Sequence, residues 1–160
     1  MIRKLHKRKD RKGAAIIETA FALPVLFILL FGLVEFGRAF WAIQALNAAA
    51  RKGAYSGMMG GVSNAEVRAE IKDFLAASNI DVSDAQIFIL DGSPYDQLGA
   101  DDDPPSADEL SPVDLLDEDV MVPRALAIVR IEVPFEDISI LSPVWLGDAT
   151  IVGQVAMRHE

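Results

Sequence analysis

The stretch Ala14–Val34, AAIIETAFALPVLFILLFGLV, decides the architecture of this chain, because its 21 residues hold a single charged residue, Glu18. A helix needs about 20 apolar residues to cross the hydrocarbon core of a bilayer. From Ala20 to Val34 the stretch is apolar on every side, whereas a core helix of a small soluble domain shows a polar face. The stretch therefore predicts a membrane-spanning helix.

The residues before this helix predict its orientation. Residues 1–13 hold seven of the 15 Lys and Arg residues of the chain and one acid. The positive-inside rule then places this basic leader in the cytoplasm, with the remainder translocated. In a bacterium this means a single-pass protein of the inner membrane with a periplasmic body. The alternative is a cleaved secretory signal ending at Ala48–Ala50, which lies farther from the apolar run than an ordinary cleavage site.

Composition excludes several classes of function. The chain has 160 residues, about one domain, and no cysteine, which excludes disulfides, thiolate metal sites and cysteine nucleophiles. His6 and His159 are the two histidines, one near each end, so a histidine-based metal or catalytic centre is not expected. The net charge of −9 disfavours nucleic acid as a partner. No nucleotide-binding loop or nucleophile motif is present. We expect no cofactor, no metal and no enzymatic activity.

The helical pattern continues beyond the membrane segment. No Pro or Gly pair interrupts it before Gly60-Gly61, so Ala14–Ser56 is predicted as one helix about 65 Å long at ~1.5 Å per residue. Spacing of three or four residues puts six side chains on one face: Phe36, Phe40, Ile43, Asn47, Ala50 and Ala54. The predicted organisation is a leader at 1–13, a transmembrane and extended helix at 14–57, and a body at 58–160.

The body is predicted to be a small α+β unit with a short antiparallel sheet. Ser63 and Glu66 form a capping-box pattern that opens a second helix, ending at about Ser78. Three segments rich in branched residues predict strands at 85–90, 125–134 and 150–158. The loop at 137–146 contains Pro143 and Trp145 and is apolar, which indicates contact with the membrane or a partner.

Residues 91–123 form a strongly acidic segment. They contain eleven acids, five prolines and no Lys or Arg, so we expect a mobile, solvated loop that buries little apolar area. Asp101–Asp103 suggests a calcium loop, but the twelfth position of an EF-hand pattern is occupied by Pro112 rather than an acid. A calcium site is therefore not expected here.

Small residues recur at every fourth position of the long helix: Ala45, Ala49, Gly53 and Gly57. Such a stripe lets another helix approach closely. The partner is either a neighbouring subunit in an assembly or the chain's own body, and the sequence leaves both open.

The presence of Glu18 needs an explanation, because placing a carboxylate inside a membrane-spanning helix costs free energy. If the chain is cut between Gly13 and Ala14, the new ammonium group at Ala14 lies one helical turn from Glu18 and neutralises it. A glycine before the cut presents no side chain to the peptidase. The alternative is a carboxylate that snorkels to the interface or is protonated there.

These residues resemble a known processing site. The basic leader, GAAIIETA and the apolar helix together look like the start of type IV prepilins and pseudopilins. The whole run Gly13–Ala54, and the ending VAMRHE at Val155–Glu160, resemble the TadE-like pseudopilins of tight-adherence (Flp, type IVc) pilus systems. Thr19 departs from the family, which often has Tyr or Phe after the acid.

The resemblance implies a minor pseudopilin, a structural or assembly component of a bacterial pilus system. It implies cleavage after Gly13 by a prepilin peptidase, with Glu18 guiding subunit recognition. The partners would be the membrane, that peptidase and other pilin or pseudopilin subunits. The alternative is an uncleaved single-pass protein whose acidic body binds an envelope partner.

Overall fold

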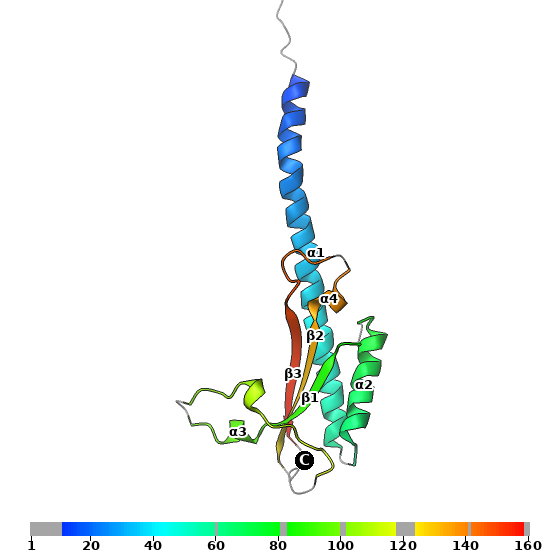
Figure 1. The fold of residues 1–160 in the computed structure, drawn as a ribbon, viewed down its shortest axis with the longest axis vertical. Helices are drawn as coiled ribbons and strands as arrows, with labels where there is room; N and C mark the ends of the chain where they lie inside the picture. The colour runs from blue at the N-terminus through cyan, green and yellow to red at the C-terminus, as the bar shows by residue number, and fades with distance from the viewer. Residues whose placement is uncertain are drawn as a thin grey trace, which may run out of the picture.

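The computed structural model describes residues 11–59, 61–80, 83–99, 102–117, 124–140 and 142–158. The basic leader up to residue 10, both histidines and Asp101 lie outside these residues, as do the last two residues of VAMRHE. Within the described part, one long helix is followed by a small body of three strands and several short helices (Figure 1). The predicted α+β class is confirmed.

Helix α1, Arg11–Met58, is 48 residues long and projects well beyond the body (Figure 1). Its apolar half is long enough to cross a membrane, and none of that half is buried against the rest of the chain. Pro24 lies inside the helix. The helix ends just before Gly61, whose φ of +72° is a left-handed conformation that suits glycine. The predicted single helix is confirmed and extends two to three residues further at each end.

Helix α2, Asn64–Ala77, begins with the predicted capping box. The backbone N–H of Ser63 donates to the Glu66 carboxylate at 2.8 Å, and the Glu66 N–H donates back to the Ser63 hydroxyl at 3.3 Å. These bonds from Ser63 hold the pKa of Glu66 below its ordinary value. The apolar face of α2 packs on α1, and its fully buried residues are Val67, Ile71 and Leu75.

The sheet is antiparallel in the order β1-β2-β3, with strands at Gln86–Asp91, Leu126–Pro134 and Thr150–Arg158. Each predicted strand agrees within one residue at either end. In β2 the odd-numbered residues face α1 and are buried: Ala127, Val129, Ile131 and Val133. Arg130 and Glu132 lie on the opposite face and form an ion pair with each other.

Strand β3 lies directly against α1. A Cβ atom placed on Gly153 would stand 2.5 Å from Cβ of Leu46 and 2.6 Å from its backbone carbonyl carbon. Only glycine permits this approach, because real Cβ atoms do not come that near to backbone. The N–H of Gln154 also donates to Oδ1 of Asn47 at 3.1 Å. The second half of α1 is thus fixed to the sheet.

The helix face predicted from Phe36 to Ala54 packs on the body from Ile43 onward but not at its first two positions. Phe36 and Phe40 are 47% and 66% exposed. The face that packs on the body is instead built from small residues around Leu46: Ala39, Ala42, Ala49, Ala50 and Ala54. Small side chains allow close contact between helix and sheet, so the large aromatic residues point away.

The acidic segment has more structure than predicted. It contains the short helix α3, Ser93–Asp96, and the 3₁₀ turn η1, Ala107–Glu109. Leu110 and Val113 are each 6% exposed, and the Val113 N–H donates to the Ile89 carbonyl at 3.0 Å. The prediction that this segment buries little apolar area is therefore wrong for residues 107–113, which dock on β1.

Candidate functional site at the membrane end of the body

A buried carboxylate marks the point where the apolar half of α1 meets the body. Glu35 directly follows the apolar stretch, yet it is 9% exposed and is the buried charged residue among those that the structure describes. Its two oxygens accept three consecutive backbone N–H groups, from Val144 at 3.2 Å, Trp145 at 2.9 Å and Leu146 at 2.7 Å. These residues belong to the α4–β3 loop, which we define as residues 139–149.

Arg38 binds the chain just before the α4–β3 loop begins. Its Nε donates to the carbonyl of Ile138 at 2.8 Å, in the short helix α4, Phe135–Ile138. The guanidinium group also lies over the Trp41 ring, 4.1 Å from the ring centre. Glu35 and Arg38 are one turn apart on α1, and together they clamp the chain where it leaves α4 and where it returns toward β3. In Figure 1 this loop crosses α1 at the top of the body.

The clamp leaves an apolar surface beside the membrane helix. Ile140 is 73% exposed, Val144 69% and Trp145 47%. A cavity of about 270 Å³ opens between α1 and the loop, and apolar side chains from both dominate its lining, including Phe31, Val34 and Pro143. The Trp145 ring lies 3.7 Å from where a Cβ on Gly32 would be, so the loop reaches back alongside the apolar stretch.

The predicted processing residues lie together at the start of α1. Gly13, Ala14 and Glu18 are all exposed and fall within the first turns of the helix. Apart from its own helical turn, no described part of the chain lies within 4 Å of a Cβ placed on Gly13. The hydroxyl of Thr19, the residue that departs from the family pattern, donates to the carbonyl of Ala15 at 2.8 Å.

The predicted small-residue stripe lies mostly inside this chain. Ala49, Gly53 and Gly57 are buried, and Ala45 is half-buried. A Cβ on Gly53 would overlap the Ile71 side chain, and one on Gly57 would lie 2.8 Å from the Leu115 side chain. Helix α2 and the end of the acidic segment thus pack against the stripe. Its use between subunits stays a prediction.

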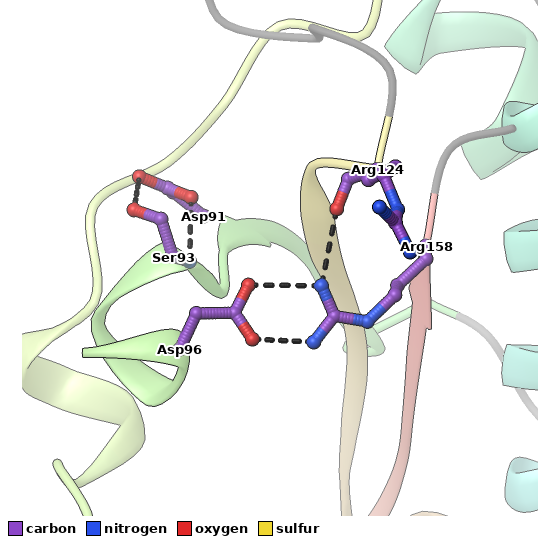
Figure 2. Close-up of polar contacts among 5 residues, drawn as sticks. All are labelled: Asp91, Ser93, Asp96, Arg124 and Arg158. Atoms are coloured by element: carbon purple, nitrogen blue, oxygen red, sulfur yellow. Dashed lines mark hydrogen bonds and ion pairs between the residues drawn. The ribbon is translucent and has the colours of Figure 1, made fainter. Parts of the chain in front are cut away.

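A second polar cluster fastens the acidic segment to the sheet (Figure 2). Arg158, at the end of β3, forms a two-pronged ion pair with Asp96 of α3 and also donates to the carbonyl of Arg124 at 3.1 Å. One guanidinium therefore holds both ends of the acidic segment. Its hydrogen bonds, and then its charge, hold the pKa of Asp96 below the ordinary value. Asp91 accepts two hydrogen bonds from Ser93 close by.

Neither cluster has the composition of a metal or catalytic centre. Among residues 11–158 that the structure describes, no group of three or more Asp, Glu or His side chains is placed to hold a metal ion. The Glu35 oxygens are occupied by backbone donors, which makes this carboxylate a structural anchor rather than an acid or base.

The comparisons with known proteins concern the same helix that carries the clamp. Residues 13–54 match the TadE-like protein family. The TadE-like match begins at Gly13 and includes Glu18, Glu35 and Arg38, and it confirms the resemblance predicted for Gly13–Ala54. A TadE-like domain indicates a protein associated with the Tad pilus, and the family is a structural component of that system. No curated protein matches the chain, and no solved structure does.

Sequence reasoning missed the role of Glu35 and Arg38. The stretch GLVEFGRA contributed to the resemblance, but no function followed from it. A signal was present, since two opposite charges one turn apart directly after a membrane segment are well placed to bind a returning loop. Their partners, however, lie 100 to 111 residues away in the chain and could not be identified locally.

Proposed function

We propose that this protein is a minor pseudopilin of a bacterial tight-adherence pilus system, anchored in the inner membrane by α1 with its body in the periplasm. It is processed after Gly13 by a prepilin peptidase and assembles with other pilin or pseudopilin subunits. It serves as a structural or assembly component, not as an enzyme.

The observation that carries this proposal is the TadE-like match over residues 13–54. It covers the predicted cleavage site, the apolar segment and the part of α1 on which the body is built. The position of the body, held beside the membrane end of α1 by Glu35 and Arg38, suits a subunit whose helix and body act together.

The surroundings of Gly13 support a role in processing. The fold makes no demand for glycine there, since its Cβ position is open and its backbone is helical. The first turn of a helix also lacks partners for its backbone N–H groups, so it unwinds at low cost into an active site. A peptidase whose active site accepts only a residue without a side chain before the cleaved bond explains why position 13 is glycine.

The position of Glu18 supports the proposed charge pairing. It is exposed on the apolar half of α1, where lipid surrounds it. After cleavage, the ammonium group of Ala14 lies four residues away, about 6 Å along the helix axis. A subunit that presents both charges is neutral at this depth, whether the pair forms within one chain or between neighbours.

Intact-mass measurement of protein purified from membranes tests the cleavage. In cells with a working prepilin peptidase, we expect the loss of residues 1–13. Gly13→Trp should retain them, whereas Gly37→Trp should not, because Gly37 is also an open glycine on α1 but lies far from the cut. Retention of the leader in the wild-type protein would overturn processing and favour an uncleaved, envelope-binding protein.

Glu18→Ala tests the role of the carboxylate. The variant should insert into the membrane normally, because the change makes the segment more apolar, but it should fail in processing or in incorporation into pili. Glu18→Gln keeps the size and removes the charge, so it should behave like Glu18→Ala. Normal processing and normal pili in both variants would refute the proposed pairing.

A further inference from the structure

The α4–β3 loop combines exposed apolar side chains with three consecutive backbone N–H groups, Val144–Leu146, that already donate to Glu35. Outside α1, the large hydrophobic residues that the structure describes as exposed are few: Met59, Leu116, Ile140, Val144 and Trp145. Three of these five lie in this one loop. An exposed apolar patch of this kind marks an interaction surface.

The loop lies at the depth of the apolar stretch of α1. The Trp145 ring contacts the helix at Gly32, inside the stretch that ends at Val34. The cavity between them is lined by Phe31 and Val34 from the helix and by Ile140 and Val144 from the loop. The apolar surface of α1 therefore extends onto the loop, and Glu35, Arg38, Ser139 and Ser142 also line the cavity between them.

Glu35 removes the main obstacle to placing this loop in lipid. Irregular backbone is costly in a bilayer because its N–H groups lose water without gaining partners. Here the N–H groups of Val144, Trp145 and Leu146 all donate to Glu35, and the Ala149 N–H donates to the Leu146 carbonyl at 3.0 Å. These four N–H groups thus have partners within the chain, while the side chains of Val144 and Trp145 stay exposed.

We propose that the α4–β3 loop is a second membrane contact of this protein, in which Ile140, Val144 and Trp145 enter the outer interface of the bilayer. The occupant of the cavity is the acyl region of a neighbouring phospholipid. Tryptophan is well suited to this depth, since its ring is apolar and its N–H remains near water. Residues 135–149 contain no Lys or Arg, so the contact is apolar and does not depend on anionic lipid or low salt.

The inference requires α1 to span a membrane but does not require the pilus role. Intact mass and pilus incorporation test the pilus role, whereas the position of the loop is measured in purified lipid. Resistance of the full-length protein to alkaline extraction from vesicles tests the span itself, so the three failures are distinguishable.

Tryptophan fluorescence of the full-length chain in phosphatidylcholine vesicles tests the contact. The chain has two tryptophans, so Trp41→Phe leaves Trp145 as the single reporter. A reference variant, with both native tryptophans replaced by Phe and with Tyr55→Trp, reports on a position outside the membrane. Tyr55 is 65% exposed on α1 and lies about 30 Å beyond Val34 along the helix. We expect lipid with brominated acyl chains to quench Trp145 several-fold more than the Tyr55→Trp reporter, and aqueous acrylamide to show the reverse order.

Two sets of variants assign the effect to the loop. Ile140→Ser with Val144→Ser removes exposed apolar groups without touching the core, so quenching of Trp145 by lipid should fall. The matched pair Met59→Ser with Leu116→Ser removes exposed apolar groups elsewhere and should change nothing. Glu35→Ala should also reduce lipid quenching, while Glu35→Gln, which keeps an acceptor oxygen, should reduce it less.

Equal acrylamide quenching of Trp145 and the Tyr55→Trp reporter would overturn the proposal. The proposal would also be overturned if Trp145 were protected from both quenchers and this protection disappeared when the protein was diluted with lipid. That result would identify a second copy of this chain as the partner that covers the loop.

Discussion

The two halves of α1 belong to one helix but meet different surroundings. Residues 13–34 are mostly apolar and remain unburied within the chain, whereas the half from Ala39 to Ala54 presents mainly alanine and glycine, together with Leu46, to a sheet and a second helix. The difference shows that overall hydrophobicity does not decide burial. The placement of small residues contributes, since alanine and glycine allow β3 and α2 to approach the backbone of α1.

The largest effect is expected from a substitution at the closest contact between β3 and the second half of α1. Gly153→Val places a side chain against the backbone of Leu46, which cannot move away, so we expect a loss of about 3 kcal/mol or more in the free energy of unfolding of the body. Urea unfolding in detergent micelles measures it. Membrane insertion should be unchanged, and Gly37→Ala, at an open position on α1, is the control.

A matched pair of leucines compares the two halves directly. Leu46 is fully buried and Leu33 is 67% exposed. Leu46→Ala should destabilise the body by roughly 3 kcal/mol, because it leaves a cavity between helix and sheet. Leu33→Ala should leave the same unfolding curve unchanged. Similar shifts from both variants would mean that the body does not depend on the second half of α1 as the structure indicates.

Gly53→Ala tests where the small-residue stripe packs. The added methyl group meets Ile71, and the resulting strain, partly offset by the better helix propensity of alanine, should cost about 1 kcal/mol. Ile71→Val in the same chain should recover part of this loss, which a double-mutant cycle on monomeric protein measures. No coupling in the monomer would favour use of the stripe between subunits.

The smallest effect concerns the acidic segment, whose Leu115 meets α1 at Gly57. Because the pKa of Asp96 is lowered in the folded protein, its pairing stabilises the fold above the ordinary value of 3.8 and is lost as the pH falls through the lowered one. Arg158→Met should return the pKa of Asp96 toward the ordinary value, as an NMR titration of its carboxyl carbon would show. The total stability should change little, since this pair is exposed. An unchanged Asp96 titration would contradict the pairing.

Local patterns predicted the elements of this fold but not the contacts between them. The capping box at Ser63, the three strands and the continuous helix each follow from neighbouring residues, and the structure agrees closely. The exposure of Phe36 and Phe40, on the same predicted face as the buried Ala50 and Ala54, has a physical reason. Spacing of three or four residues identifies a face of a helix, but it does not say whether that face meets protein, lipid or water.

The acidic segment shows a second limit of prediction from sequence. Its average composition indicated a solvated loop, yet Leu110 packs with Leu90 and Ile128 on the outer side of the sheet, and Val113 joins the core between the sheet and α1. Averages hide single residues whose partners lie far away in the chain. The same limit applies to Glu35, whose role became visible only with Val144–Leu146 beside it.

The continuity of α1 has a mechanical consequence. Beyond Pro24 the helix runs unbroken to Met58, and β3 is pressed onto its backbone at Gly153, with no flexible joint between the apolar half and the sheet. A movement of the apolar half is therefore transmitted to the sheet through one continuous helix, so the body and the helix are expected to move together.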